Sequence, residues 1–355
     1  MPKRSLLLIH PRFLLSGLRA YYFLFLFALV AGLTAAAQNR PVRFTQLGPD
    51  QGLSQSTVQC LLKDRFGFMW FGTQDGLNRY DGYTFTIYRN NPADSNSLRG
   101  NNIQVIYEDK AGDLWVGGNG GGLSKYDRKH DRFIHYKEHP IDYETLSSND
   151  ISAIYEDRQG NFWVGTYWNL NLLDRKTKKV TRFLAKESDP DSLSNDNVRA
   201  IYEDRKGNLW IGTEGGGLNL FDRKTRRFRR FRHKASDPAS ISSDAVNSIG
   251  EDDAGFLWVG SIGGGLNRLD PATGRFKRFQ YREEMAGGIP SNNVYCVVPD
   301  GKGKLWIGTD QGLCRLDPRT FRFEVHRHDP FDKRSLSHNS INALYQDPGG
   351  ILWAG

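Results

Sequence analysis

The stretch Asp204-Arg-Lys-Gly-Asn-Leu-Trp-Ile-Gly212 decides the fold, because its pattern Asp-x-x-Gly-x-x-Trp-x-Gly occurs seven times in the 355 residues. Successive tryptophans of the pattern lie 45 to 48 residues apart. Seven copies at a nearly constant period indicate an array of structural repeats. The recurring residues are Asp64, Asp109, Asp157, Asp204, Asp252, Asp300 and Asp347, with Trp70, Trp115, Trp163, Trp210, Trp258, Trp306 and Trp353.

Each repeat has the pattern of four short strands. Around Trp210, alternating apolar residues predict strands over 198–204, 209–212, 218–222 and 228–231, with Gly or Asp in the turns between them. A four-stranded unit of this length cannot bury both faces of its sheet alone, whereas radial packing of several units buries them. The sequence therefore predicts an all-β fold, a seven-bladed β-propeller of four-stranded blades, with the last blade incomplete in this chain.

The two ends of the chain suggest how the ring closes. The segment Phe44-Thr-Gln-Leu47 matches the fourth strand of the repeat, and residues 341–355 match the first two strands of the seventh repeat. We expect the N-terminal segment to supply the outer strand of that last blade. Because the sequence stops inside a repeat, we also expect it to be a fragment of a longer chain.

The fixed residues of the repeat have physical roles. Asp204 and Gly207 suit a tight turn between the first two strands, because Asp accepts hydrogen bonds from its own turn and Gly adopts positive φ. Trp210 offers a large apolar surface to the neighbouring blade. One carboxylate per repeat, always in a turn, indicates a structural role rather than a catalytic or metal-binding one.

The first 37 residues predict export from the cytoplasm. Basic residues precede an apolar run over 21–37 that ends in three alanines, which is typical of a cleaved signal peptide, and an uncleaved anchor is the alternative. Four of the eight net positive charges lie in this segment. The remaining Lys and Arg recur in turns, so residues 38–355, the predicted β-propeller domain, do not have the basic stripe of a nucleic-acid-binding protein.

No pattern for a cofactor, a metal or catalysis stands out. Cys60, Cys296 and Cys314 occupy apolar strand positions, which favours buried free thiols, although a bridge between the last two stays open. The Gly-Gly-Gly triplets lack the Lys-Ser/Thr of a phosphate-binding loop, and the histidines lack metal-ligand spacing. We therefore expect no cofactor, no metal and no catalytic residues.

The repeat resembles a known unit. The stretches Glu203-Asp-Arg-Lys-Gly-Asn-Leu-Trp-Ile-Gly-Thr-Glu-Gly-Gly-Gly-Leu218 and Gly67-Phe-Met-Trp-Phe-Gly-Thr-Gln-Asp-Gly-Leu-Asn-Arg-Tyr-Asp-Gly82 are similar to the two-component regulator propeller repeat, and the resemblance covers residues 42–355. In that family, such repeats form the periplasmic sensor of hybrid two-component systems in Bacteroidetes. Two propellers typically precede a small β-domain, a membrane helix, a histidine kinase, a receiver and a DNA-binding module.

The resemblance implies a function for this region. Many members respond to glycan breakdown products, so it implies an oligosaccharide or other small ligand, a homodimer formed through the full-length parent, and control of transcription. It places the chain in the periplasm, with the parent anchored in the inner membrane by its N-terminal segment or by parts beyond this sequence. Kinase activity belongs to that parent, and this chain itself is expected to be no enzyme and to bind no nucleic acid.

The variable loops point to a binding face. In a propeller, the turns between second and third strands and the loops between blades emerge on one face, and both vary in this chain, as around 91–102 and 140–150. Trp168 is the one tryptophan outside the repeat position and could stack on a sugar, or could cover a neighbouring loop. The candidate ligand-binding residues are Tyr167, Trp168, Asn169, Asn119, Glu214 and Asp310.

Two alternatives stay open from sequence. The same surface could bind a protein as an interaction scaffold, and some propellers are glycosidases or lyases. A glycosidase needs two carboxylates on one face, whereas the recurrent acids here are in turns. The basic turns on the opposite face, such as Arg223-Lys-Thr-Arg-Arg227, have the pattern of solvated turns, with partner docking as the alternative.

Overall fold

A computed structural model describes residues 42–139, 141–284 and 287–355. The predicted signal peptide over 1–37 lies outside these residues. The described chain contains no helix long and apolar enough to cross a bilayer. Its one short 3-10 helix, η1, spans Pro49–Gln51, and all other regular elements are strands. The part from Gln46 to Gly355 forms one unit and is described by itself.

Six antiparallel sheets of four strands succeed one another along the chain, and we call them blades 1–6 with strands A–D. The A strands are β1 (Val58–Lys63), β5 (Ile103–Glu108), β9 (Ile151–Glu156), β13 (Val198–Glu203), β17 (Val246–Glu251) and β21 (Val294–Pro299). The B strands are β2 (Met69–Thr73), β6 (Leu114–Gly118), β10 (Phe162–Thr166), β14 (Leu209–Thr213), β18 (Leu257–Ser261) and β22 (Leu305–Thr309).

The outer strands complete each blade. The C strands are β3 (Gly76–Tyr80), β7 (Gly122–Asp127), β11 (Leu170–Leu173), β15 (Gly217–Asp222), β19 (Gly265–Asp270) and β23 (Gly312–Asp317). The D strands are β4 (Phe85–Tyr88), β8 (Arg132–Tyr136), β12 (Val180–Phe183), β16 (Arg227–Phe231), β20 (Arg275–Phe279) and β24 (Arg322–His326). Each strand pairs with its neighbours in the order A-B-C-D.

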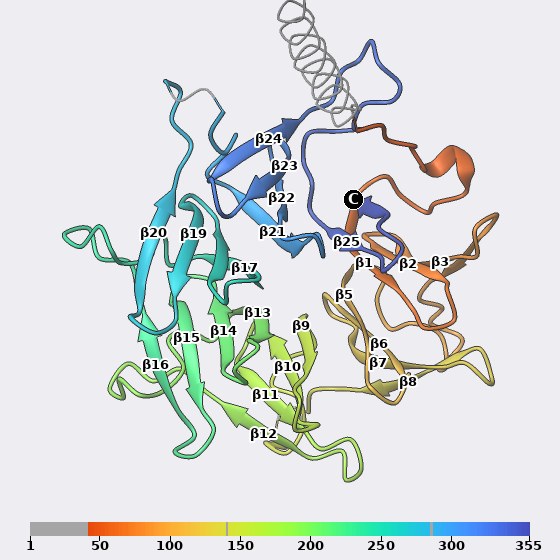
Figure 1. The fold of residues 1–355 in the computed structure, drawn as a ribbon. Helices are drawn as coiled ribbons and strands as arrows, with labels where there is room; N and C mark the ends of the chain where they lie inside the picture. Colours follow the sequence, from red (N-terminus) through yellow and green to blue (C-terminus); the bar gives the residue numbers. More distant parts are fainter. Residues whose placement is uncertain (1–41, 140, 285–286) are drawn as a thin grey trace, which may run out of the picture. The chain divides into compact units, whose positions relative to one another are not determined.

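The blades stand around a central axis with their A strands innermost (Figure 1). Each A strand contacts the A strand of the next blade, from β1 to β21. A two-stranded sheet, β25 (Leu344–Gln346) with β26 (Leu352–Ala354), fills the seventh sector, where β25 contacts both β21 and β1. Trp353 packs there against Phe71, with ring centroids 5.9 Å apart. The ring therefore closes through this two-stranded sheet.

The expectation of a seven-bladed propeller with an incomplete last blade is wrong, because the described residues form six four-stranded blades and a separate two-stranded sheet. Only the A and B strands of the seventh repeat lie within this sequence. The expected outer strand at Phe44–Leu47 does not form either, since residues 42–48 contain no strand. Gln46 instead donates a side-chain hydrogen bond to the carbonyl oxygen of Ser335 at 3.3 Å.

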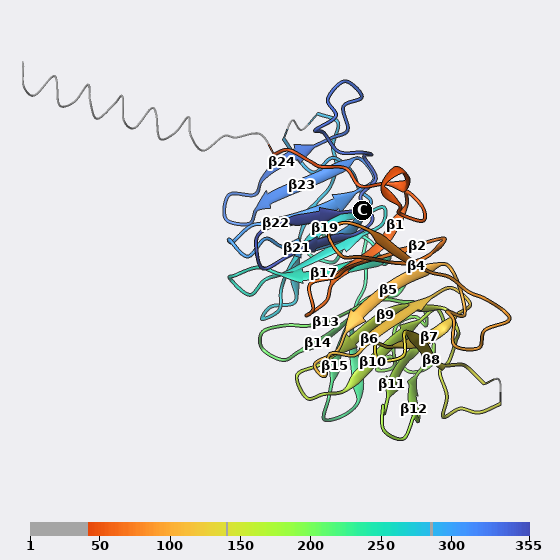
Figure 2. The same ribbon diagram turned by 90° about the vertical axis from the view of Figure 1, so that its right-hand side faces the viewer.

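The core lies between blades rather than within them. Trp210 of blade 4 packs with Ile241, Val246 and Leu257 of the next blade and its preceding loop. All five residues of every B strand are buried, so the B strands carry the interblade contact. The side view in Figure 2 shows the ring turned by 90°, with β21–β24 of blade 6 toward its upper end and β11 and β12 of blade 3 toward its lower end.

Candidate functional site

The loops divide between two faces of the ring. The B–C turns and the D–A loops that join successive blades lie on one, which we call the loop face, and the A–B and C–D turns lie on the other, the turn face. A hollow of about 810 Å³ opens on the loop face between blades 3 and 4. It is lined by Tyr167, Trp168, Ala185, Lys186, Glu187, Ser194, Asn195, Asp196, Asn197, Glu214, Arg230 and Arg232.

Trp168 is an exposed aromatic on a fixed backbone. Its side chain is 63% exposed, which places it at the rim of the hollow rather than under a neighbouring loop of the described chain. Its amide donates to Thr166 Oγ1 at 3.0 Å, and its carbonyl accepts from the hydroxyls of Thr166 and Ser147. An indole held in this way offers a stacking surface that needs little ordering when a ligand arrives.

Arg199 joins Tyr167 to Glu214. Its guanidinium lies 4.7 Å from the centre of the Tyr167 ring, and its Nε donates to Glu214 Oε2 at 2.7 Å. Asn197 donates to the same carboxylate oxygen at 3.1 Å. Burial lowers the pKa of Arg199, but the hydrogen bond and charge of Glu214 outweigh burial and leave the pKa raised. Glu214 in the wall of the hollow is thus held in an ion pair with Arg199, whose guanidinium lies over the Tyr167 ring.

Asn169 builds the turn rather than the hollow. Its φ of 81° is left-handed, a conformation that glycine holds at the equivalent position of blade 4, Gly217. The amide of Asn169 donates to the carbonyl oxygen of Asp196 at 2.8 Å, which ties the B–C turn to the following D–A loop. The side chain is buried and does not line the hollow.

The two remaining candidate residues stand in other blades. Asn119 is in the B–C turn of blade 2, where its amide donates to the carbonyl oxygen of Asn102 at 3.0 Å. Asp310 is in the B–C turn of blade 6 and accepts from Asn293 at 2.8 Å. The structure therefore brings together Tyr167, Trp168 and Glu214, and it places Asn119 and Asp310 elsewhere on the loop face.

Buried oxygens without hydrogen-bond partners gather on the loop face. Within the described part of the chain, every such side-chain oxygen lies in a B–C turn, in a D–A loop or next to the start of an A strand: Gln59, Asn119, Asn169, Asn197, Ser242 and Asp310. A buried acceptor without a donor is costly and is usually satisfied by water or a ligand. The side-chain oxygens that the described chain leaves without a donor thus gather on the loop face, each of them covered by surrounding protein atoms.

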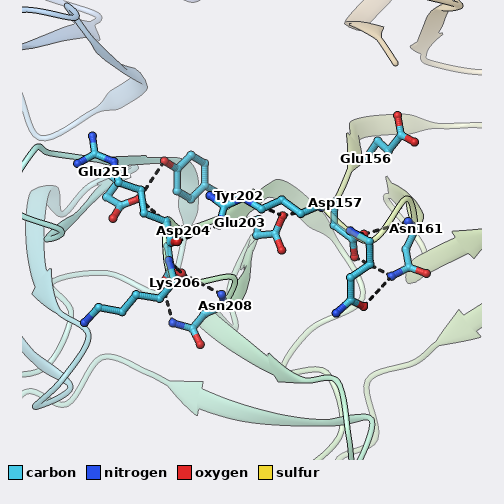
Figure 3. A network of polar contacts seen from close by, with 12 residues as sticks. Glu156, Asp157, Asn161, Tyr202, Glu203, Asp204, Lys206, Asn208 and Glu251 are labelled. Atoms are coloured by element: carbon cyan, nitrogen blue, oxygen red, sulfur yellow. Dashed lines mark hydrogen bonds and ion pairs between the residues drawn. The ribbon is translucent and has the colours of Figure 1, made fainter. Parts of the chain in front are cut away.

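The turn face is occupied by a structural network, part of which Figure 3 shows. Trp163 donates from its indole to Asp157 at 2.9 Å, and Arg223 of the next blade pairs with the same carboxylate. Arg223 also pairs with Glu203 at 2.8 Å, and Glu203 accepts from the amide of Arg158 at 2.7 Å. Asp157 thus joins a turn, the repeat tryptophan and the adjacent blade, and Arg223 is bound rather than solvated.

This network makes the stability depend on pH. Burial raises the pKa of Asp157, but hydrogen bonds from Trp163 and Arg223 outweigh it and lower the pKa below its usual 3.8. Because the pKa of Asp157 is lower in the folded than in the unfolded state, its ionised carboxylate stabilises the fold at pH values above the usual pKa. This contribution is lost as the pH falls through the folded pKa. We expect Asp157→Asn to destabilise by about 1–3 kcal/mol at neutral pH, and by much less at pH values below the folded pKa.

Denaturant unfolding of both proteins at several pH values measures this difference. Asp253→Asn is the control, because Asp253 is 64% exposed in its pair with Arg205 and should change stability little. If the difference in unfolding free energy between Asp157→Asn and the parent protein stayed constant down to acid pH, the stabilising role given to this network would be refuted.

The cysteines are free thiols. The open possibility of a bridge between Cys296 and Cys314 is not realised, and burial raises the pKa of each to about 12. Neutral buried thiols are unreactive. Among the described residues, no group of three or more His, Cys, Asp or Glu side chains is arranged to hold a metal ion.

Several charged residues in and beside the hollow could not be predicted from the repeat pattern, to which none of them belongs. Lys186 lies in the D–A loop before blade 4 and Arg232 in the D–A loop after it. Arg199, which pairs with Glu214, lies in the A strand of blade 4. One signal was present in the sequence. Arg199 is the one charged side chain at its position in the seven A segments, where the other repeats have amide, hydroxyl or phenol groups.

Comparison with protein families identifies the repeat. The model described as "Two component regulator propeller" matches residues 52–75, 97–120, 145–168, 192–215, 288–311 and 335–355. Over 73 residues, or 21% of this chain, the sequence is 49% identical to a relative named histidine kinase P4 from Formosa agariphila. The match covers 5% of that relative.

Solved structures show the same architecture. The extracellular domain of the hybrid two-component system BT3049 from B. thetaiotaomicron is 28% identical with a TM-score of 0.76, over 89% of this chain and 40% of that one. The extracellular domain of BT4673 from the same organism is 24% identical with a TM-score of 0.70, over 88% of this chain and 38% of that one, and supports the fold. This chain therefore spans less than half the length of these structures.

The prediction that these residues are not themselves the enzyme is confirmed by the resemblance of the chain to the extracellular propeller domain of a two-component system. The recurring unit is the one its sequence predicts: the chain contains two-component regulator propeller repeats.

Proposed function

We propose that this chain is the ligand-sensing propeller of a hybrid two-component sensor kinase, and that it binds glycan-derived oligosaccharides in the hollow between blades 3 and 4. The observation that carries the proposal is the fixed, exposed indole of Trp168 at the rim of a hollow that is also lined by Glu214, the carboxylate paired with Arg199. An aromatic ring stacks on the apolar face of a sugar, while the charged and amide groups hydrogen-bond its hydroxyls. Binding would favour one arrangement of the parent, which would then control transcription.

The proposed location and partners follow from the same assignment. The solved relative BT3049 is an extracellular domain, and residues 1–37 have the pattern of an export signal. The propeller would thus lie in the periplasm, with the parent anchored in the inner membrane and acting as a homodimer. The partner of this region would be a small ligand and not a nucleic acid.

A propeller glycosidase is less well supported. Glu214 is already paired with Arg199, and Asp196 accepts the amide of Ala185 at 2.7 Å. Both carboxylates already accept hydrogen bonds from other groups of the chain. A glycosidase needs one protonated acid poised beside the scissile bond. Hydrolysis of a glycan by the purified chain would nevertheless favour a glycosidase over a ligand-sensing propeller.

A binding screen of the full chain against neutral and acidic oligosaccharides tests the proposal. We expect at least one oligosaccharide to bind saturably, and Trp168→Ala to weaken that binding about tenfold or more while the fold is retained. Phe66→Ala is the matched control, because Phe66 is also 63% exposed but lies in an A–B turn on the turn face. Equal loss in both variants, or binding untouched by Trp168→Ala, would refute the assignment of the hollow.

A further inference from the structure

A ring of polar side chains surrounds the axis of the propeller on the loop face. Each of the seven sectors contributes the residue that follows the first apolar residue of its A segment. These residues, which we call the axial ring, are Gln59, Gln104, Ser152, Arg199, Asn247, Tyr295 and Asn342. In every sector the residues on either side of the axial-ring residue are apolar or small. The ring residue itself is polar and varies in side-chain chemistry among the sectors.

In the six four-stranded blades, a β-bulge falls at the ring residue and turns its side chain toward the axis. In blade 1, Val58 pairs with Thr73 and Cys60 pairs with Gly72, so Gln59 is left without a partner on strand B. The same shift falls at the ring residue in the other five four-stranded blades. An extra residue in one strand turns its side chain out of the alternation of the sheet, a device that often occurs beside functional sites.

The axial ring lines one shared cavity of about 390 Å³. Because residues from all seven sectors border it, this cavity lies on the axis at the loop-face end of the A strands. Its volume is in the lower part of the range of roughly 300–1,000 Å³ for small-molecule sites. The axial cavity is separate from the hollow between blades 3 and 4, although Arg199 borders the first and contacts residues of the second.

The chemistry of the axial cavity is polar and close to neutral. Its one charged side chain is Arg199, whose charge is matched by Glu214. Gln59 Oε1 is buried without a hydrogen-bond partner among the described residues. Neighbouring ring members are tied together, since Asn247 donates to the carbonyl oxygen of Tyr295 at 2.9 Å. The cavity is thus lined mainly by amides and a phenol, side chains that can hydrogen-bond a ligand.

We propose that the axial cavity is a second binding site, which takes a neutral, hydroxyl-rich ligand of the size of a mono- or disaccharide. Amides both donate and accept, which suits hydroxyl groups that do the same, and an anion would find only an already paired guanidinium. The proposal goes beyond the proposed function, because it needs neither Trp168 nor the hollow.

Nuclear magnetic resonance of the ¹⁵N-labelled full chain tests this site. The probes are maltose, cellobiose and N,N′-diacetylchitobiose, with galacturonate as the charged comparison. The side-chain amide signals of Gln59 and Gln104 are assigned with Gln59→Met and Gln104→Met, which keep the length of the side chain. We expect at least one neutral disaccharide to shift these signals saturably and galacturonate to leave them unchanged.

Variants separate this site from the hollow. Gln59→Met or Gln104→Met should weaken binding of that disaccharide about tenfold. The effect is taken from a variant that keeps the dispersed amide spectrum of the parent protein. Trp168→Ala should leave the affinity for the disaccharide unchanged. Absence of any saturable shift with the three neutral probes, or a shift abolished by Trp168→Ala and not by the ring variants, would overturn the proposal. Failure of oligosaccharide binding in the hollow would leave this result unaffected.

Discussion

Replacement of Trp210 by alanine is expected to lower the free energy of unfolding by about 3–5 kcal/mol, because it empties an interblade core. Trp210 is 1% exposed and packs against the A strand of the next blade. Its indole also donates to Asp204 Oδ2 at 2.9 Å, so truncation removes a donor from a buried carboxylate. The loss of packing and the loss of the hydrogen bond act in the same direction.

Urea unfolding followed by circular dichroism measures the effect, and Trp168→Ala is the internal control. Both variants lose an indole, but Trp168 is exposed and its removal should change stability by less than about 1 kcal/mol. If the two variants were equally stable, the assignment of the repeat tryptophan to an interblade core would be wrong.

Replacement of Gly260 by alanine is expected to destabilise by about 1–3 kcal/mol through overpacking. This glycine is the last residue of the repeat pattern in blade 5. A Cβ atom there would lie 2.5 Å from Val294 Cγ1 and 3.2 Å from Val294 Cβ, in the A strand of blade 6. Since Val294 sits in a paired strand, blades 5 and 6 would have to separate to relieve the contact.

Gly48→Ala is the control for this substitution, because a Cβ atom at Gly48 would meet only a flexible glutamine side chain at 3.8 Å. Thermal unfolding of both variants measures the difference. The account of blade packing fails if Gly260→Ala unfolds at the same temperature as Gly48→Ala.

The repeat pattern was enough to predict most of the fold. Asp204, Gly207 and Trp210 each have a local role that can be recognised from residue type, and the four strands of each repeat follow from alternation. The seventh blade was predicted wrongly. The match of Phe44–Leu47 to an outer strand was a similarity of pattern, whereas an outer strand forms only beside a C strand, and the seventh sector has none in this sequence.

The site was predictable only where the repeat is broken. Tyr167, Trp168 and Glu214 stand out because they replace or precede the glycines of a B–C turn, and the structure brings them together. Arg199 was missed because strict alternation places its side chain on a face of the sheet, while the β-bulge turns it toward the axis. A bulge has no signature in a simple alternation of apolar and polar residues, so the axial ring could not be read from the strand pattern.

The central claim is that ligand binds to the loop face, and hydrogen–deuterium exchange of the full chain tests it most directly. The chain would be compared alone and with the tightest-binding oligosaccharide of the screen. We predict protection in the D–A loop over 184–197 and in the B–C turns around Trp168 and Glu214, with no change in the A–B and C–D turns. Protection confined to the turn face, or no saturable binding of any oligosaccharide to the folded chain, would contradict the account.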